Sequence, residues 1–391
     1  MKIAKKRILV LDGMWNKSLA AVRSLGKRGL YVTAGEKTIL ATALFSKHCN
    51  KRLVYPSPLS RPEEFLDTLE NEIRTGDYDA VFPMEFFTQA LLTSGINRER
   101  LERYTRLPFA DSGLLKRIND KAFLMKYAKD IGIDIPKTFF ANGVEGCAEI
   151  ADNIKYPVLI KPRVSSGSRG IVYVRGKDEL VSSYAGVHEK YPFPIIQEYI
   201  PDGGETFGVG LLLNRNSEIR ASFVYKRLRS YPVAGGPSTL RESVRRDDVR
   251  EIAEYLMKSV GWTGVAHVEF RVDPRDGRPI LIEVNPRFWG SLQLAVEAGV
   301  DFPFLLYRMS VEGDIEPVTE YAAGVRCRWL IPGDILHFIK NPDRFSLEPG
   351  FFDFKVKDDI LSLPDPMPVI GRIASVLTFL YDREMRDILS K

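Results

Sequence analysis

The sequence predicts an α/β unit at its N-terminal end and α+β structure over most of the remaining chain. Strand and helix patterns alternate in roughly the first 108 residues, which is typical of an open parallel sheet with right-handed crossovers. Farther along, strand patterns follow one another at 205–213 and 217–229, and residues 264–287 have the pattern of a β-hairpin around a polar turn. We expect these consecutive strands to pair with each other.

The N-terminal unit begins with the apolar run RILVLDG at 7–13, the pattern of a buried parallel strand. A helical pattern follows at 17–29, and further strand patterns occur at 30–36 and 77–85. The first strand-to-helix turn contains Gly13 but no G-x-G-x-x-G. The fingerprint of dinucleotide binding is therefore absent, which disfavours a NAD-dependent dehydrogenase.

The composition is that of a folded protein in a reducing compartment. Of 391 residues, 45% are hydrophobic and 11% aromatic, which argues against disorder. The net charge of +5 (56 Lys+Arg minus 51 Asp+Glu) is too mild to predict nucleic-acid binding. Cys49, Cys147 and Cys327 lie far apart without a CxxC pair, and no apolar run approaches about 18 residues. We expect a cytoplasmic protein without a membrane span or a secretory signal.

The middle of the chain predicts several further elements. Residues 114–140 predict a helix that stops at Gly132 and then a strand. Residues 156–175 predict a strand, a glycine-serine loop and a second strand, and 194–200 predict another strand. Residues 245–262 have the apolar spacing of an amphipathic helix.

The hairpin at 264–287 places acidic side chains on one face. Residues two apart on a strand share a face, so His267 lies beside Glu269, and Glu283 lies beside Asn285. If the turn centres on Asp276, Glu269 lies opposite Glu283, and two facing carboxylates destabilise a sheet unless a charge compensates them. A divalent cation would supply that compensation.

An ordinary surface hairpin, with its acids paired to Arg271 and Arg287, fits the same pattern about equally well. A slip of one residue would put the two glutamates on opposite faces.

A second group of residues is suited to phosphate. Lys161 ends the apolar run YPVLI, where a buried ammonium group needs an anion. The loop SSGSRG at 165–170 follows, and its glycines allow backbone N–H groups to approach phosphate oxygens, although such a loop is more often only a turn. Glu198 and Glu205 in QEYIPDGGE are read most simply as exposed acids, and Lys121 as a solvated helix residue.

Taken in order, the segments NDK, YPVLIKP, SSGSRG, QEYI, VEF and LIEVNPR resemble the ATP-grasp superfamily, over about residues 110–312. The sequence is similar to the ATP-binding domains of carbamoyl phosphate synthetase large subunits and to carboxylate–amine ligases. The resemblance implies an ATP-grasp fold in which two α+β lobes enclose ATP. It implies a Rossmann-like domain over 1–108, an N-terminal lobe over 109–200, a C-terminal lobe with the metal site over 201–315 and an extension of unknown role over 316–391.

The resemblance also implies roles for individual residues. The groups implied to bind nucleotide phosphates are Lys121, Lys161 and a closing loop that contains Ser165, Ser166, Gly167, Ser168 and Gly170. The groups implied to meet adenine and ribose are Glu198, the backbone of Tyr199 and Ile200, and Glu205. The groups implied to hold one or two Mg²⁺ (or Mn²⁺) ions are Glu269, Glu283 and Asn285, with Arg287 at the transferring phosphate.

The function implied is an ATP- and Mg²⁺-dependent ligase that activates a small-molecule carboxylate as an acyl-phosphate and transfers it to an amine. Two alternatives stay open: phosphoryl transfer of a kinase-like or carbamoyl-phosphate type without ligation, and a nucleotide-binding regulator without catalysis. Lys226, Arg229 and Arg241 are candidates to grip the acceptor carboxylate, and they fit solvent-facing loop positions equally well. Glu85 ends a strand where open sheets expose ligand sites. A homodimer is possible.

The last segment predicts one more helix. Ile370, Ile373, Leu377 and Leu380 recur at helical spacing and form one apolar face. We expect this face to pack on the body of the protein rather than to lie on a membrane surface.

Overall fold

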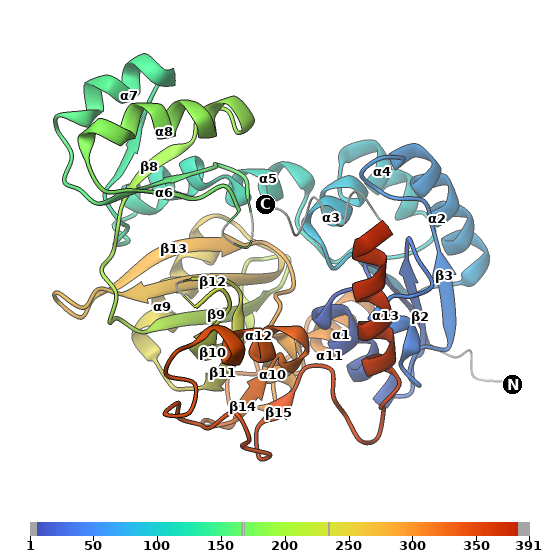
Figure 1. Cartoon of the computed structure of the whole chain (residues 1–391). Helices are drawn as coiled ribbons and strands as arrows, with labels where there is room; N and C mark the ends of the chain where they lie inside the picture. Colours follow the sequence, from blue (N-terminus) through green and yellow to red (C-terminus); the bar gives the residue numbers. More distant parts are fainter. Residues whose placement is uncertain (1–5, 166, 168, 234, 382–391) are drawn as a thin grey trace, which may run out of the picture.

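In the computed structural model, which describes residues 6–381 except 166, 168 and 234, the strands form three sheets (Figure 1). The first sheet is parallel, with the order β3-β2-β1-β4, and confirms the α/β unit predicted for the N-terminal end. Its strands are β1 (Arg7–Val10), β2 (Tyr31–Glu36), β3 (Lys51–Val54) and β4 (Ala80–Phe82). The helices of this part are α1 (Asn16–Lys27), η1 (Thr42–Phe45), α2 (Pro62–Gly76), α3 (Phe86–Leu92) and α4 (Gly95–Leu101).

Strand β3 is absent from the prediction because it lies at the edge of this sheet. Its sequence KRLV alternates between half-buried and exposed positions instead of forming an apolar run. Strand β1, between β2 and β4, is buried over Ile8–Val10 and is therefore easily recognised in the sequence.

A second, antiparallel sheet forms a separate lobe with the order β5-β8-β6-β7, and helices α7 and α8 cover it (Figure 1). Its elements are β5 (Thr138–Phe140), α7 (Gly143–Ala151), β6 (Val158–Lys161), β7 (Val172–Val174), α8 (Lys177–Lys190) and β8 (Ile195–Glu198). The strand–loop–strand prediction for 156–175 is confirmed.

The prediction of a single helix before this lobe is wrong. Two helices, α5 (Ser112–Asn119) and α6 (Lys121–Asp130), occupy the segment. The chain breaks at Asp120 because this residue has an extended backbone and its side chain accepts a hydrogen bond from the backbone N–H of Ala122, as an N-cap residue does.

The third sheet has the order β13-β12-β9-β10-β11-β14-β15. Its principal strands are β9 (Thr206–Leu213), β10 (Ile219–Ser230), β11 (Ser238–Ser243), β12 (Gly264–Val272) and β13 (Pro279–Asn285). The accompanying helices are α9 (Asp247–Ser259), α10 (Leu292–Glu297) and α11 (Phe302–Glu312). Within this sheet, β9 pairs with β10 in antiparallel fashion, as expected for consecutive strands. It also pairs with β12 in antiparallel fashion, a contact between strands distant in sequence that was not predicted.

The two faces of the large sheet have different partners. Val209, Val268 and Phe270 on one face share a core with α9. On the other face, Phe223 and Val265 share a core with α1, α10, α11 and the N-terminal sheet. Farther along the same strands this second face becomes polar, and it is there that most of the predicted metal and phosphate residues lie.

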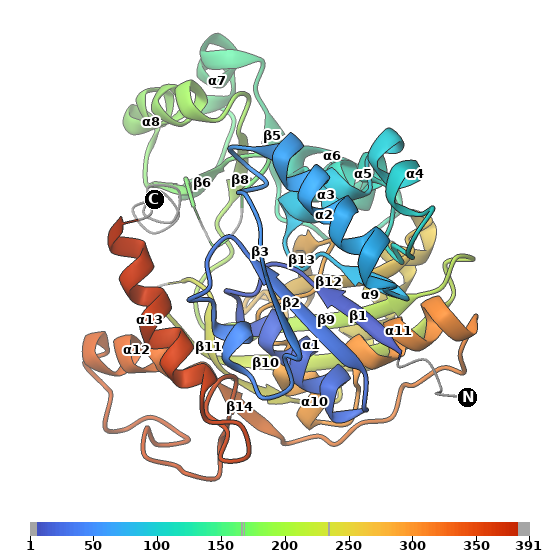
Figure 2. The same cartoon turned by 90° about the vertical axis from the view of Figure 1, so that its right-hand side faces the viewer.

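The C-terminal extension adds β14 (Arg326–Arg328) and β15 (Lys357–Asp358) to the edge of the large sheet. It also contains η2 (Leu330–Asp334), α12 (Ile335–Lys340) and α13 (Pro368–Tyr381). Figures 1 and 2 show α13 running along the N-terminal unit, beside the large sheet. No helix among residues 6–381, gaps excepted, is long and apolar enough to cross a membrane.

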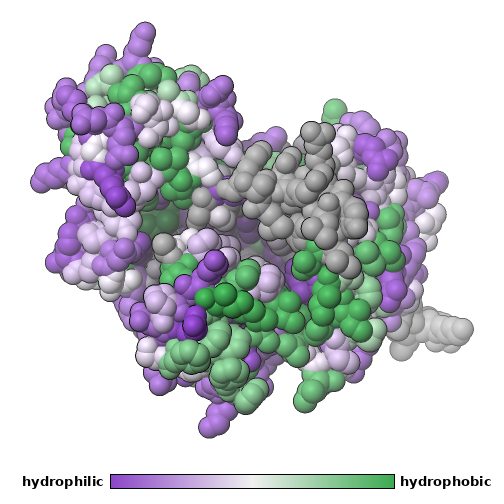
Figure 3. All heavy atoms as spheres, in the orientation of Figure 1, coloured by the Kyte–Doolittle hydropathy of each residue, from purple (hydrophilic) through white to green (hydrophobic). Residues whose placement is uncertain are grey.

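The last helix packs on the body as predicted, but not through Ile370 and Ile373 of the predicted apolar face. Helix α13 packs through Gly371, Arg372 and Ser375, whereas the side chains of Ile370 and Ile373 are 52% and 55% exposed. Gly371 allows the close approach, because a Cβ there would lie 2.7 Å from the ring of Phe45 in η1. Figure 3 shows hydrophobic surface along this part of the molecule, and the side chains of Leu377 and Leu380 lie outside the described set.

Candidate functional site

The acidic hairpin has the predicted register. Glu269 of β12 pairs with Glu283 of β13, and His267 pairs with Asn285. Both carboxylates therefore lie on the polar face of the large sheet, next to each other on adjacent strands.

Several polar side chains contact the carboxylate pair, among them Asn285, Arg227 and Lys121. The Nδ2 atom of Asn285 donates to Glu283 Oε1 at 3.1 Å and to Glu269 Oε1 at 3.5 Å. Arg227 Nη2 donates to Glu269 Oε2 at 3.0 Å, and Lys121 Nζ lies 3.6 Å from Glu283 Oε2. Each glutamate thus has its own cation, and the amide joins them.

The electrostatics of the pair favour an additional cation. Burial raises the pKa of Glu269, an effect that Arg227 opposes and Glu283 reinforces. Burial acts in the same direction on Glu283, but the ammonium group of Lys121 and the amide of Asn285 bring its pKa below the usual value. A bound cation would remove the remaining repulsion between the two carboxylates.

These residues fit magnesium. Within the described ranges, no group of three or more His, Cys, Asp or Glu side chains is arranged to hold a metal ion, so a site dense in protein ligands is not present there. Mg²⁺ usually takes only one or two carboxylates, with waters and substrate phosphates completing its shell. Glu269, Glu283 and Asn285 match that smaller requirement, with the nucleotide supplying further oxygens.

Arg287 lies at the junction between the large sheet and the N-terminal unit. Its Nε atom is 3.9 Å from Glu85 Oε2, and Glu85 Oε1 is 2.7 Å from the Nζ atom of Lys17 in α1. Lys17 Nζ also donates to the carbonyl of Phe288 at 3.3 Å. Burial, reinforced by Arg287, lowers the pKa of Lys17 to about 8. The predicted residues Arg287 and Glu85 are therefore brought together, and Lys17 joins them.

The two predicted phosphate lysines lie close enough for the charge of one to act on the other. Lys161 is buried, and its Nζ atom donates to Gln197 Oε1 at 2.6 Å. Lys121, the first residue of α6, donates from Nζ to the backbone carbonyl of Ser165 at 3.0 Å. Burial and the charge of Lys121 lower the pKa of Lys161 to about 8, while Glu283 acts in the opposite direction. An anion between the lysines would be stabilised by both.

Nucleotide affinity is expected to fall with rising pH because of Lys161. Only the protonated lysine attracts a phosphate, so the dissociation constant for ADP should rise up to roughly tenfold per pH unit above about 8. The groups that set this titration are Lys121, Glu283 and Arg271. Isothermal titration calorimetry between pH 7 and 9.5 measures the effect, since phosphate groups with a second pKa of about 6 do not titrate there.

The Lys161→Arg variant provides the control, because a guanidinium group stays charged over this range. A flat pH profile is expected for it. The same pH dependence in both proteins would show that another group is responsible.

The predicted closing loop is described only in part. Gly167 and Gly170 have φ values of +64° and +71°, and Gly170 sits so close to Pro162 and Tyr191 that a Cβ would lie 2.8 Å from each. Ser165 accepts from Lys121 through its backbone carbonyl, whereas Ser166 and Ser168 lie outside the described residues. These two glycines therefore adopt left-handed backbone conformations that other residue types rarely adopt.

The predicted adenine and ribose residues lie on the connection between β8 and β9. Glu198 accepts from the backbone N–H of Lys137 at 3.3 Å and pairs with Arg275 at 2.8 Å. The backbone N–H of Tyr199 donates to the carbonyl of Pro157 at 3.3 Å, and Ile200 is buried. These residues lie at the connection between the small lobe and the large sheet, and their nucleotide roles stay predictions.

The structure contradicts the role predicted for Lys226 beside the acceptor. Lys226 pairs with Phe207 in the sheet and therefore lies on the face opposite to Glu269. Its Nζ atom is 3.0 Å from Glu205 Oε1, so it joins the predicted ribose residue instead. Arg229 is also excluded, because its buried guanidinium group is occupied by Asp334.

Arg241 lies on the same face as the metal pair but in β11, where it bonds Asp359 at 2.8 Å. Its predicted contact with the acceptor is untested.

Several site residues are not predicted by the sequence. Arg227, which bonds Glu269, is one position beyond the wrongly chosen Lys226. Behind the pair, the rings of Tyr225, His267 and Trp289 stack, with centroids 5.7 Å and 5.5 Å apart. Tyr225 Oη lies 2.9 Å from His267 Nε2, and burial lowers the histidine pKa to about 3, so this imidazole is neutral. The alternation of β10 could have identified Arg227 only if the pairing of β9 with both neighbours had been known.

The glycine in β9 makes room for this aromatic layer. A Cβ at Gly208 would lie 2.4 Å from the ring of Tyr225 and 2.5 Å from His267 Nε2. The side of the site behind the carboxylate pair is thus formed by aromatic rings.

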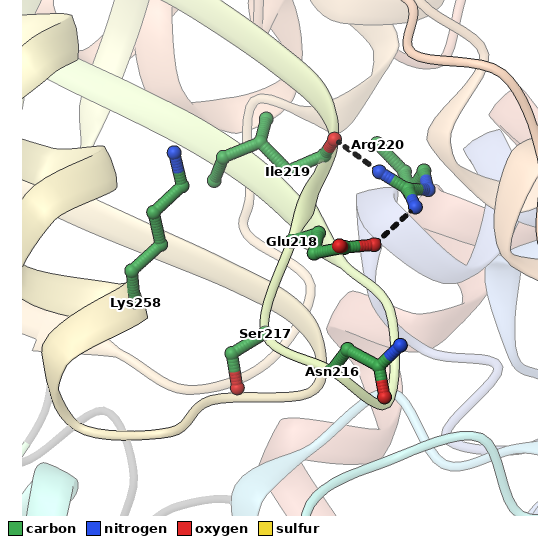
Figure 4. A pocket seen from close by; sticks show the side chains of 6 residues that line it. All are labelled: Asn216, Ser217, Glu218, Ile219, Arg220 and Lys258. Atoms are coloured by element: carbon green, nitrogen blue, oxygen red, sulfur yellow. Dashed lines mark hydrogen bonds and ion pairs between the residues drawn. The ribbon is translucent and has the colours of Figure 1, made fainter.

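A polar pocket lies elsewhere, at the turn between β9 and β10 (Figure 4). It is lined by Asn216, Ser217, Glu218, Ile219, Arg220 and Lys258. Its arginine pairs with Glu218 and with Asp314. None of the predicted nucleotide or metal residues lines it, so it is separate from the candidate site.

Comparison with known proteins supports the resemblance. Residues 118–291 match the ATP-grasp domain family. The chain is 25% identical over 379 residues to the carbamoyl phosphate synthase large chain of Thermotoga neapolitana, which covers 92% of this chain and 33% of the relative. The chain therefore spans about a third of the length of that relative.

Solved structures with a similar fold include two enzymes. The biotin carboxylase domain dimer of Hydrogenobacter thermophilus 2-oxoglutarate carboxylase, in complex with MgADP, ADP and bicarbonate, has a TM-score of 0.68 at 17% identity, covering 82% of this chain and 73% of that one. The N5-carboxyaminoimidazole synthetase of Staphylococcus aureus has a TM-score of 0.63 at 14% identity, covering 83% and 82%. These likenesses confirm the predicted architecture.

Proposed function

We propose that this chain, of which residues 118–291 match the ATP-grasp domain family, is an ATP- and Mg²⁺-dependent ligase that joins a small-molecule carboxylate to an amine or a similar nucleophile. The observation that carries the proposal is the pair Glu269 and Glu283, which lie side by side and near the buried side chains of Lys121 and Lys161. This combination suits a nucleotide triphosphate with its metal.

The assignment of groups in this proposal follows the geometry. Lys121 and Lys161 neutralise the phosphates, Glu269, Glu283 and Asn285 hold Mg²⁺, and Arg287 steadies the transferred phosphoryl group. Bound magnesium supplies charge neutralisation at the phosphate oxygens. The loop at 165–170 closes over the nucleotide, and the segment from Glu198 to Ile200 with Glu205 binds the nucleoside. The domain boundaries at 108, 200 and 315 remain part of the proposal.

The chemistry needs positioning rather than a nucleophilic side chain. An oxygen of the acid attacks the γ-phosphorus, and ADP leaves with the bridging oxygen, which yields an acyl-phosphate. The amine nitrogen then attacks the carbonyl carbon, and inorganic phosphate leaves with one oxygen of the original acid. Lysines and an arginine at fixed positions stabilise the charge on the phosphoryl oxygens in both steps.

The test is an ADP-release screen of acids crossed with amines. ADP should form only when both substrates are present, and an acid labelled with oxygen-18 should deliver one labelled oxygen to each phosphate released. ADP formed without an amine, together with a phosphorylated acid, would favour the kinase-like or carbamoyl-phosphate alternative. Nucleotide binding without turnover on any pair, unchanged in Glu283→Gln, would favour a regulator.

The wider setting is also proposed on the strength of the relatives. The Hydrogenobacter domain is a dimer, and we propose the same state for this chain, together with a cytoplasmic location. Analytical ultracentrifugation of the full chain tests the dimer.

A further inference from the structure

A buried polar cluster joins the C-terminal extension to the N-terminal unit. Asp359, which follows β15, accepts from Arg241 Nη2 through both oxygens, at 2.8 and 2.9 Å, and from Asn16 Nδ2 at 3.1 Å. Arg372 of α13 in turn donates to Asn16 Oδ1. Two guanidinium groups from distant parts of the sequence are thus linked through one carboxylate and one amide.

This cluster carries two positive charges and one negative charge. Arg241 and Arg372 are only 1% and 6% exposed, and Asp359 is the acidic group that contacts Arg241. Three N–H positions, Nε and Nη1 of Arg241 and Nε of Arg372, have no hydrogen-bond partner among the described residues. A buried cation with unpaired donors is costly unless an acceptor meets it. The side chains therefore call for an anion from outside the described protein groups.

The first turn of α1 is the third component. Asn16 is its first residue, Trp15 at the N-cap makes no side-chain capping bond, and the first turn of this 12-residue helix has no acidic residue. The N-terminal end of a helix carries partial positive charge and free N–H groups, which favour an anion. On the next residue, Lys17 reaches Phe288 beside Arg287, so this turn lies between the two arginine sites.

The cluster is remote from the metal pair. Strands β9 and β10 separate β12, which bears Glu269, from β11, which bears Arg241. Three strand spacings amount to roughly 14 Å between the two backbones. Arg227, the cross-strand partner of Arg241, donates to Glu269, whereas Arg241 donates to Asp359. An oxyanion at Arg241 is therefore a different group from the phosphate at Mg²⁺.

Resting on the proposed function, we propose that Arg241, Arg372 and the N-terminal turn of α1 bind a second oxyanion of the acid substrate, remote from the carboxylate that is phosphorylated. The substrate class is then an elongated acid with an oxyanion at each end, either a dicarboxylate or a carboxylic acid with a phosphate ester. Asp359 and Asn16 are positioning residues in this site. The C-terminal extension thereby becomes part of substrate recognition.

The test uses the full chain and measures binding without turnover. Linear dicarboxylates of increasing length, the matching monocarboxylates and inorganic phosphate are titrated by calorimetry in the presence of MgADP. Long dicarboxylates should bind at least tenfold more tightly than monocarboxylates of equal length. Stronger binding of inorganic phosphate than of any dicarboxylate would assign the subsite to a phosphate ester, and equal affinity for monocarboxylates and dicarboxylates, without phosphate binding, would overturn the inference.

Arg372→Gln and Arg241→Gln should each lower this affinity at least tenfold and leave MgADP affinity within twofold. The matched control is Arg344→Gln, an arginine of the same extension that lies over the ring of Phe338 at the surface. This variant should change neither the affinity for the dicarboxylate nor the affinity for MgADP. Unchanged anion affinity in folded Arg372→Gln would show that the arginine only anchors α13, and would overturn the proposal.

Hydrogen exchange on the wild-type chain covers the case of a variant that does not fold. The anion that binds should protect amides in residues 239–243 and 368–376, and no added protection in either segment would contradict the site. Ligation activity confined to monocarboxylates would refute this inference and leave the proposed function intact. Anion binding without any ADP formation would support this anion site and contradict the proposed ligase function.

Discussion

Replacing Glu283 with glutamine is expected to reduce ADP formation by roughly 10²- to 10³-fold, the usual effect of removing one electrostatic group from a transition state. The amide keeps the shape of the side chain but removes the charge that faces Glu269 on the neighbouring strand and Lys121 across the cleft. Magnesium would lose one of two carboxylates, and so the concentration of Mg²⁺ needed for half-maximal ADP formation should rise. A coupled ADP assay over a range of Mg²⁺ measures both effects.

A readout without turnover separates this metal effect from misfolding. Mg²⁺ added with ADP should raise the melting temperature of the wild-type chain and have little effect on Glu283→Gln, while the variant without metal stays folded because it has lost a carboxylate that repels Glu269. Glu251→Gln provides the control, since this acid is 69% exposed on α9, against the other face of the sheet. Wild-type Mg²⁺ dependence in Glu283→Gln would refute the metal site.

The hairpin could be predicted from sequence because its information is local. The strand alternation on each side of DPRDGRP identifies the hairpin and its turn. Next to the turn, however, Phe270 pairs with Leu281, and a bulge between Phe270 and Glu269 shifts the register by one residue so that Glu269 faces Glu283. Lys161 was likewise recognisable, because one ammonium group at the end of a buried run is conspicuous. The family resemblance then assigned both to one cleft.

Other parts of the site depend on contacts that no local pattern contains. The choice of Lys226 over Arg227 turns on which face of β10 meets β12, and β9 lies between those strands. The face of α13 could not be predicted from apolar spacing, because the helix packs where Arg372 meets Asn16, some 350 residues away in sequence. Periodicity identifies an apolar stripe, whereas a buried polar network is defined only by its partners.

The attachment of the C-terminal extension predicts a second large effect. Asp365→Ala should lower the free energy of unfolding by about 3–5 kcal/mol, the usual cost of breaking a buried ion pair. The Asp365 carboxylate lies 2.8 Å from Arg23 Nε in α1 and accepts from Ser46 Oγ at 2.7 Å and from the backbone N–H of Lys47 at 2.9 Å. Both charged side chains are almost fully buried, so the alanine variant leaves an unpaired guanidinium inside the protein.

Chemical unfolding followed by tryptophan fluorescence measures this loss. The control is Asp343→Ala, which removes an exposed acid of the same extension and is expected to lie within about 0.5 kcal/mol of wild type.

Burial alone would raise the pKa of Asp365, but Arg23 and the N–H of Lys47 bring it below the usual value. Because the pKa of this carboxyl is lower in the folded state, its ionised form stabilises the protein above the unfolded-state pKa of about 3.9. This stabilisation is lost as the pH falls through the folded-state pKa. The difference between wild type and Asp365→Ala should therefore shrink below pH 4. A constant difference down to pH 2, or one no larger than that of the control, would mean that the extension is held by its apolar contacts and its two strands instead of by this ion pair.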